Sequence, residues 1–238
     1  MPIKYMILSH ARTGSNFLVS VLAQHPDIES HNELFHERTI FTSQGAINDE
    51  DVIKRRDKAV VPYLQKTLKQ SDKPVRGFKH LLFNNQEIIE YVMNGAFHLI
   101  LLERENILAQ YSSFKIALNT KQWTVFSGDG VVKPSPLVWD VADFEAYRKQ
   151  YTNTYDSLKT QTDKRKYPAH HVYYTDLLTQ KAQDAIFTFL EVHPVSVDDS
   201  ILPRKQNTKQ IIDRFEQPDV VRDHLKAINY PQWETESV

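Results

Sequence analysis

The chain contains no cysteine, only 6 glycines among its 238 residues, and no apolar run near the ~18 residues that a membrane-spanning helix requires. The absence of cysteine excludes disulfides, zinc–thiolate sites and cysteine nucleophiles. Because glycine normally supplies ~7% of residues, each glycine at an element boundary is informative. Neither sign of charge predominates: the chain has 29 Lys and Arg and 30 Asp and Glu, for a net charge of -1. This balance argues against a polybasic nucleic-acid binder.

The remaining composition is that of a globular protein, with 41% hydrophobic and 25% charged residues. The length predicts a single domain over residues 1–238. The first residues, MPIKYMILSHARTGS, have an apolar patch too short for a secretory signal and no small-residue cleavage site. We therefore expect a cytoplasmic protein with no nucleic-acid partner and no integral membrane association. The oligomeric state is not readable.

Apolar runs and amphipathic stretches alternate along the chain. Strands are predicted over residues 3–9, 75–82, 97–102 and 170–174, with another just before Glu33. Helices are predicted from residue 14 to about 25 and over residues 49–70, 84–94, 105–118, 140–162, 177–190 and 208–228. This alternation predicts an α/β fold whose central parallel sheet is covered by helices on both faces. In such sheets ligands bind at the carboxyl ends of the strands.

The first strand is followed by the polar segment Ser9-His10-Ala11-Arg12-Thr13-Gly14-Ser15-Asn16, which opens a helix. Backbone N–H groups at a helix N-terminus favour a phosphate, and Arg12 adds a planar, charged donor. Thr13, Ser15 and Asn16 add short polar donors. The alternative is a capped turn with a surface arginine. The motif G-x-x-x-x-G-K-[ST] is absent, which argues against an ordinary ATPase or GTPase.

The buried strand at residues 97–102 is followed by Arg104, and Ser112 lies eight residues further on. On one ideal helix the two would lie ~12 Å apart along the axis, too far to share a phosphate. They can act together only if Arg104 sits at the strand end and reaches toward the helix that holds Ser112. The alternative is a helix cap and a buried serine.

Taken together, RTGSNFL after the first strand and LLERENILAQYSS after the buried strand resemble the sulfotransferases that use 3′-phosphoadenosine-5′-phosphosulfate (PAPS). The resemblance implies a P-loop-NTPase-like three-layer fold. It also implies that Arg12-Thr13-Gly14-Ser15 and Asn16 hold the 5′-phosphosulfate, while Arg104 and Ser112 hold the 3′-phosphate. Asn106 fits the R-x-N variant of bacterial members. The pattern Arg-Thr-Gly-Ser…Asn-Glu-Leu-Phe is most similar to bacterial carbohydrate-type sulfotransferases.

Weaker similarities extend along the chain. Tyr173-Tyr174-Thr175-Asp176-Leu177 resembles the family's Y-E-D-L strand end, with threonine in place of glutamate, and implies that Tyr174 lies near the adenine. Arg204 and Lys205 resemble the basic segment that closes over the nucleotide, here residues 203–238. Residues 121–140 form a long loop with Trp123, Phe126 and Trp139. This loop is a candidate acceptor-binding lid, and its aromatic residues are equally suited to a satellite core.

The resemblance implies transfer of a sulfuryl group from PAPS to a hydroxyl or amine of an acceptor, a small molecule or a glycan, with release of 3′,5′-adenosine bisphosphate. Arg12 would stabilise the leaving phosphate, and Lys79 would contact the sulfuryl group. The candidates for the base are His31, Glu33, His36 and His80, and Glu33 matches the glutamate of the bacterial pattern. Neighbouring residues on a strand point to opposite faces, so Lys79 and His80 should not both face the site.

No metal is expected, because H-E-x-x-H and other paired ligand spacings are absent. Two alternatives remain open. One is a P-loop-like nucleotide kinase or other phosphoryl transferase, which should need a GK[ST] lysine and a magnesium-binding carboxylate. The other is a non-catalytic nucleotide-binding protein of the same fold. The identity of the acceptor is not readable.

Overall fold

The computed structural model of the chain describes residues 2–126, 128–204 and 206–236. The chain forms two compact units, Met1–Glu103 with Gln161–Leu202, and Arg104–Thr160 with Pro203–Val238. Each unit is described by itself below. The single sulfotransferase-like domain over residues 1–238, with a lid at 121–140 and a closing segment at 203–238, stays a prediction.

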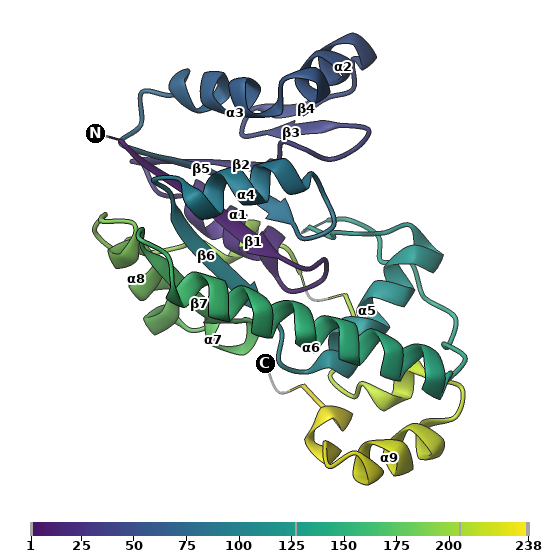
Figure 1. Cartoon of the computed structure of the whole chain (residues 1–238). Helices are drawn as coiled ribbons and strands as arrows, with labels where there is room; N and C mark the ends of the chain where they lie inside the picture. The colour runs from purple at the N-terminus through teal and green to yellow at the C-terminus, as the bar shows by residue number, and fades with distance from the viewer. Residues whose placement is uncertain (1, 127, 205, 237–238) are drawn as a thin grey trace. The chain divides into compact units, whose positions relative to one another are not determined.

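The first unit is built on one parallel sheet. Its strands are β1 (Ile3–Ser9), β2 (Ile28–Glu33), β5 (Val75–Leu81), β6 (His98–Glu103) and β7 (Ala169–Tyr173). Their order across the sheet is β2-β5-β1-β6-β7, and all neighbouring pairs are parallel (Figure 1). Residues Tyr5–Ser9 of the central strand β1 are buried, and the apolar run Tyr5–Leu8 suits a strand that is covered on both faces. The predicted strands at 3–9, 75–82, 97–102 and 170–174 are thus confirmed to within a residue or two.

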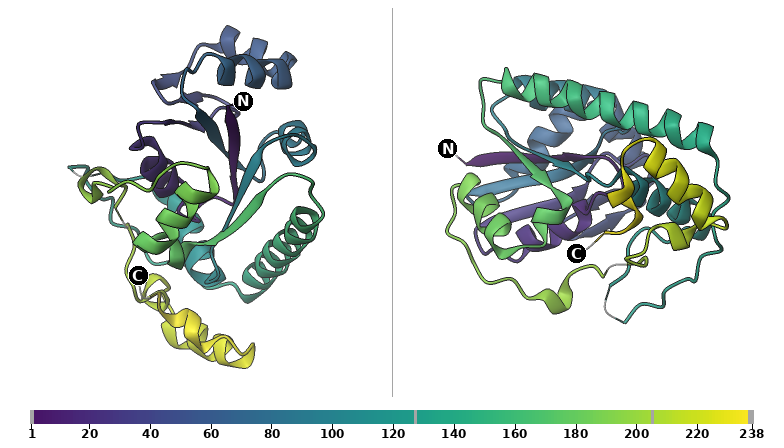
Figure 2. Two further views of the ribbon diagram at one scale, coloured as in Figure 1. Left: turned by 90° about the vertical axis from the view of Figure 1, so that its left-hand side faces the viewer. Right: turned by 90° about the horizontal axis from the view of Figure 1, so that it is seen from below.

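Helices cover both faces of this sheet, which confirms the predicted fold class. Helices α1 (Ser15–Ala23) and α8 (Gln180–Phe189) lie on one side, and α4 (Gln86–Asn94) lies on the other (Figure 2, left). Leu18 and Leu22 of α1 pack with Phe187 of α8 against sheet residues such as Ile7 and Ile100. The apolar stripe of each helix therefore forms the core with the apolar face of the sheet.

Two predicted helices of this unit differ in the structure. Residues 49–70 form α2 (Glu50–Lys58) and α3 (Val60–Lys69), because Ala59 between them leaves the helical region with φ -152° and ψ 60°. The helix predicted over 177–190 is α8, which begins at Gln180 with Thr179 capping it through its hydroxyl, and the short helix α7 (Tyr174–Leu177) before it was not predicted. A hairpin of β3 (Ile40–Thr42) and β4 (Gly45–Ile47) was not predicted, since each strand has only three residues.

The second unit is mainly helical. It contains α5 (Ile107–Thr120), most of α6 (Val141–Asp163), α9 (Pro218–Ala227) and 3-10 turns at Ile212–Arg214 and Pro231–Glu234. The helix predicted over 208–228 begins only at Pro218, a residue that favours the first helical position. In the part of the chain that the structure describes, no helix is long and apolar enough to cross a membrane.

Candidate functional site

The polar loop after β1 forms a tight turn into α1. Gly14 is the N-cap of α1 in the left-handed conformation, with φ 88°, and Arg12 is left-handed too, with φ 64°. The Thr13 hydroxyl donates to the carbonyl oxygen of His10 at 2.8 Å and fixes the turn. A left-handed residue other than glycine or asparagine is uncommon and costs free energy. The turn therefore holds Arg12 in a strained conformation just before the positive end of a helix dipole, a favourable place for an anion.

The ring of Tyr174 covers this loop closely at Gly14. A Cβ atom built on Gly14 would lie 2.5 Å from Cδ2 and 2.8 Å from Cε2 of Tyr174. Glycine is therefore required here for two reasons, the positive φ and the aromatic ring. Tyr174 follows β7 directly as the first residue of α7. The structure thus brings together the first loop and the tyrosine that the sequence placed near the nucleotide.

Lys79 lies beneath the loop in a buried position, with only 2% of its surface exposed. Its ammonium group forms an ion pair with Glu33 Oε1 at 2.8 Å and donates to Asn16 Oδ1. Burial lowers the pKa of Lys79, and the charge of Glu33 opposes that shift. One buried cation thereby ties the first turn of α1 to the carboxyl end of β2.

Glu33 owes its place opposite Lys79 to an irregularity in the pairing of β2 with β5. His31 pairs with Phe78, but Glu33 pairs with Lys79, so one extra residue is accommodated between them. Such bulges re-aim side chains next to functional sites. The Glu33 side chain is 14% exposed, and Asn84 Nδ2, just past β5, lies 3.5 Å from Glu33 Oε2.

The three candidate histidines have other contacts. His31 Nδ1 accepts from the Ser43 amide at 2.9 Å, and burial lowers its pKa. His36 Nδ1 accepts from the Arg38 amide at 3.3 Å. His80 lies fully buried against the rings of Phe35 and Phe78, and its Nε2 donates to the Asn85 carbonyl at 3.1 Å. Burial lowers the pKa of His80 to about 4, so it is a neutral core residue.

Arg104 and Ser112 belong to the second unit, on either side of the start of α5. Arg104 is 6% exposed, and its guanidinium makes a two-pronged ion pair with Glu236: Nε donates to Oε1 at 2.7 Å, and Nη2 donates to Oε2. The Tyr151 hydroxyl accepts from the Arg104 amide at 3.0 Å. The arginine expected to hold a phosphate is therefore paired with a carboxylate of its own chain.

Ser112 has a buried arginine as its neighbour. Its Oγ accepts from Arg214 Nη1 at 2.9 Å and donates to the Ala109 carbonyl at 3.2 Å. Asn106 caps α5 by accepting from the Ala109 amide at 2.9 Å. Sequence reasoning missed Arg214 and Glu236, because both lie more than 100 residues from their partners and stand in no recognisable motif.

The remaining predicted residues divide as follows. Arg204 is exposed, and its backbone N–H donates to the Val125 carbonyl at 2.8 Å. Lys205 lies outside the described residues. In the loop at 121–140, Trp139 packs against Phe144 and Phe215, which makes it part of a satellite core. Trp123 and Phe126 are exposed.

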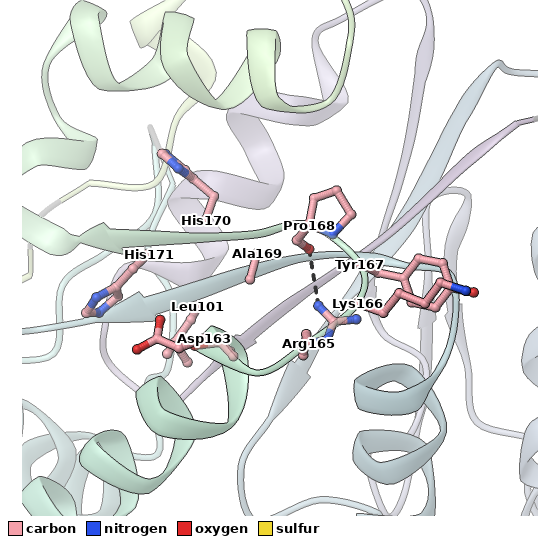
Figure 3. A pocket seen from close by; sticks show the side chains of 10 residues that line it. Leu101, Asp163, Arg165, Lys166, Tyr167, Pro168, Ala169, His170 and His171 are labelled. Carbon is pink, nitrogen blue, oxygen red and sulfur yellow. Dashed lines mark hydrogen bonds between the residues drawn. The ribbon is translucent and has the colours of Figure 1, made fainter.

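A cavity of about 400 Å³ lies around the connection into β7 (Figure 3). None of the predicted site residues lines it. Arg165 borders this cavity, but its guanidinium donates to the Pro168 carbonyl at 3.2 Å and to carbonyls at the end of α4, including Val92 O at 2.9 Å. Arg165 therefore caps a helix. Over residues 2–126, 128–204 and 206–236, no group of three or more His, Asp or Glu is arranged to hold a metal ion.

Comparison with known proteins gives two kinds of match, and no family model matches the chain. Nodulation protein H of Rhizobium meliloti strain 1021, and a second Rhizobium meliloti protein of that name, are each 29% identical over 159 residues, 62% of this chain. The chain thus spans 61% of the length of the curated relatives it matches. The crystal structure of a sulfotransferase from Alicyclobacillus acidocaldarius aligns over 98% of both chains, with 17% identity and a TM-score of 0.48. The sequence match supports the resemblance to the PAPS-dependent sulfotransferase family.

Proposed function

We propose that this chain is a sulfotransferase that moves the sulfuryl group of PAPS to a hydroxyl or amine of an acceptor. The main support for the proposal is one observation. The loop that turns at Gly14 into α1 is connected to the Glu33 carboxylate through the buried Lys79, which contacts both Asn16 and Glu33. Lys79 thereby holds the N-terminus of α1, which suits an anion, and the candidate base Glu33 close to each other. The motif pair of the sequence and the match to nodulation protein H agree with this assignment.

In the transfer step, the acceptor oxygen or nitrogen forms a bond to sulfur while the bond from sulfur to the bridging phosphate oxygen breaks. The leaving 3′,5′-adenosine bisphosphate takes that electron pair, and the acceptor proton goes to Glu33. Arg12 and the N–H groups at the start of α1 stabilise the charge that develops on the leaving phosphate. Lys79 acts as a positioning residue, because it holds Glu33 Oε1 and Asn16 in a fixed arrangement.

The residues assigned to the nucleotide are Thr13, Gly14, Ser15, Asn16 and Tyr174 for the 5′ end, and Arg104, Ser112, Arg204 and Lys205 for the 3′-phosphate. The assignment of Glu33 as the base is favoured over His31, His36 and His80, since each histidine is engaged in backbone contacts. Phe83 is 59% exposed beside Asn84, and a flat aromatic face of this kind suits the apolar face of a sugar. A carbohydrate acceptor and a cytoplasmic location stay predictions.

Turnover tests the base assignment. PAPS is incubated with sugars, alcohols and amines, and release of 3′,5′-adenosine bisphosphate is measured for the unchanged protein, Glu33→Gln and Glu37→Gln. Glu37, four residues further on, is 76% exposed and paired with Arg38, so its variant is the matched control. We expect Glu33→Gln to bind donor normally and to lose ~10²–10⁴-fold in turnover, the usual share of a general base. Normal turnover in Glu33→Gln would refute the assignment.

A further inference from the structure

The residue assigned to the 3′-phosphate already holds an anion supplied by the same chain. Arg104 and Glu236 face each other with two parallel N–H···O contacts, and their side chains are 7% and 2% exposed. This two-pronged geometry is the one by which arginine also binds phosphate. A phosphate that took the same Nε and Nη2 donors would have to displace the Glu236 carboxylate, because both groups are anionic and would occupy the same edge of the guanidinium.

The segment that presents Glu236 is anchored by contacts that leave its carboxylate uninvolved. Asn106 Nδ2 donates to the carbonyls of Trp233 at 3.2 Å and Thr235 at 3.0 Å. The Ile211 amide donates to the Glu234 carbonyl at 2.8 Å. The backbone of residues 233–235 is therefore held beside α5 by neutral hydrogen bonds, and the Glu236 side chain can leave Arg104 without breaking them.

We propose that Glu236 is a built-in competitor of the nucleotide: its carboxylate occupies Arg104 in the ligand-free protein and is displaced by the 3′-phosphate of donor or product. The inference rests on the proposed function, since it assigns that phosphate to Arg104. It adds a regulatory contact at the same site. Only molecules whose free phosphate outcompetes the carboxylate bind fully, and the returning carboxylate speeds release of the bisphosphate product.

Competition of this kind raises the apparent Kd of the nucleotide, which equals the intrinsic Kd divided by the fraction of molecules in which Arg104 is available. Glu236→Gln keeps the shape of the side chain and an acceptor for one arginine N–H, but it removes the negative charge. The Kd for 3′,5′-adenosine bisphosphate should fall by about tenfold, whereas the Kd for 5′-AMP should stay within about twofold. Glu234→Gln is the matched control, because Glu234 lies in the same segment and pairs with Arg222 at 3.1 Å.

The experiment is calorimetric titration of both nucleotides into the unchanged protein, Glu236→Gln and Glu234→Gln. Tighter bisphosphate binding in Glu236→Gln alone supports the competitor. Equal or weaker binding in Glu236→Gln, with the preference for the 3′-phosphate retained in the unchanged protein, overturns the competitor and leaves the proposed function standing. No preference for the 3′-phosphate in the unchanged protein overturns the proposed function, and the competitor with it.

A second measurement keeps the inference testable if Glu236→Gln fails to fold. The Glu236 amide donates to the Lys209 carbonyl at 3.0 Å, so hydrogen exchange reports on its attachment in the unchanged protein. If displacement of the side chain also moves the Glu236 backbone, which lies outside the anchored residues 233–235, saturating bisphosphate should speed exchange of the Glu236 amide, and 5′-AMP should not. A ligand that merely stabilises the fold slows exchange everywhere, and slower exchange at Glu236 would overturn the inference.

Discussion

Replacing Lys79 by methionine removes the cation that contacts both Glu33 and Asn16, while keeping much of the shape of the side chain. Lys79 is 2% exposed, and its ammonium lies 2.8 Å from Glu33 Oε1. Breaking a buried ion pair by deleting one partner costs 3–5 kcal/mol. Because water still reaches part of the Glu33 side chain, which is 14% exposed, we place the loss at the lower end, about 3 kcal/mol of unfolding free energy.

The assay is urea unfolding of Lys79→Met, Glu33→Gln and the double variant, compared with Lys54→Met. Lys54 forms an exposed ion pair with Glu50 at 3.2 Å, so its loss should cost under ~0.5 kcal/mol. The double variant should lose at least ~1 kcal/mol less than the sum of the two single variants, since it leaves no unpaired buried charge. A Lys79→Met variant as stable as Lys54→Met, or strict additivity in the cycle, would refute the reasoning.

Two further predictions concern the first loop and the core. Gly14→Ala should lose about 2 kcal/mol of stability, because it combines a positive φ with a Cβ atom 2.5 Å from the Tyr174 ring. Thermal melts of Gly14→Ala and Gly130→Ala test this prediction. Gly130→Ala is the control, since a Cβ on Gly130 meets nothing within 4 Å. The pKa of His80 falls from 6.5 to about 4 on folding, so the unfolded chain binds a proton that the folded chain does not as pH falls from 6.5 to 4. Stability should therefore drop over that range, and the advantage of the unchanged protein over His80→Gln should shrink by ~2 kcal/mol between pH 7 and pH 5. A constant difference across this range would contradict the assignment of His80 as a neutral core residue.

The middle of the sheet was predictable because its central strands β5, β1 and β6 are largely buried. The runs Tyr5–Leu8 and Leu99–Leu102 are continuous apolar segments followed by polar residues, and the structure places the strands β1 and β6 there. The break at Ala59 was not predictable, since the amphipathic pattern continues through it. The delayed start of α9 at Pro218 was missed for a similar reason: residues 208–217 have a helical composition but form turns.

The candidate site was predictable in its parts and not in its pairings. Arg12, Gly14 and Arg104 stand in short motifs whose chemistry can be recognised locally. The partners are set by tertiary structure: Glu33 reaches Lys79 through a bulge in β2, and Glu236 reaches Arg104 across 132 residues. A local pattern holds no signal for either contact. Strand alternation did predict that Lys79 and His80 face opposite sides, and the structure turns Lys79 to Glu33 and His80 to the rings of the core.

The most direct test of the account is the binding of 3′,5′-adenosine bisphosphate by calorimetry, with 5′-AMP and ATP as comparators and Arg104→Ala as the variant. The account predicts that the bisphosphate binds much more tightly than 5′-AMP or ATP. It also predicts that Arg104→Ala removes most of this preference while leaving 5′-AMP binding unchanged. Equal binding of the bisphosphate and 5′-AMP to the unchanged protein would contradict the sulfotransferase assignment.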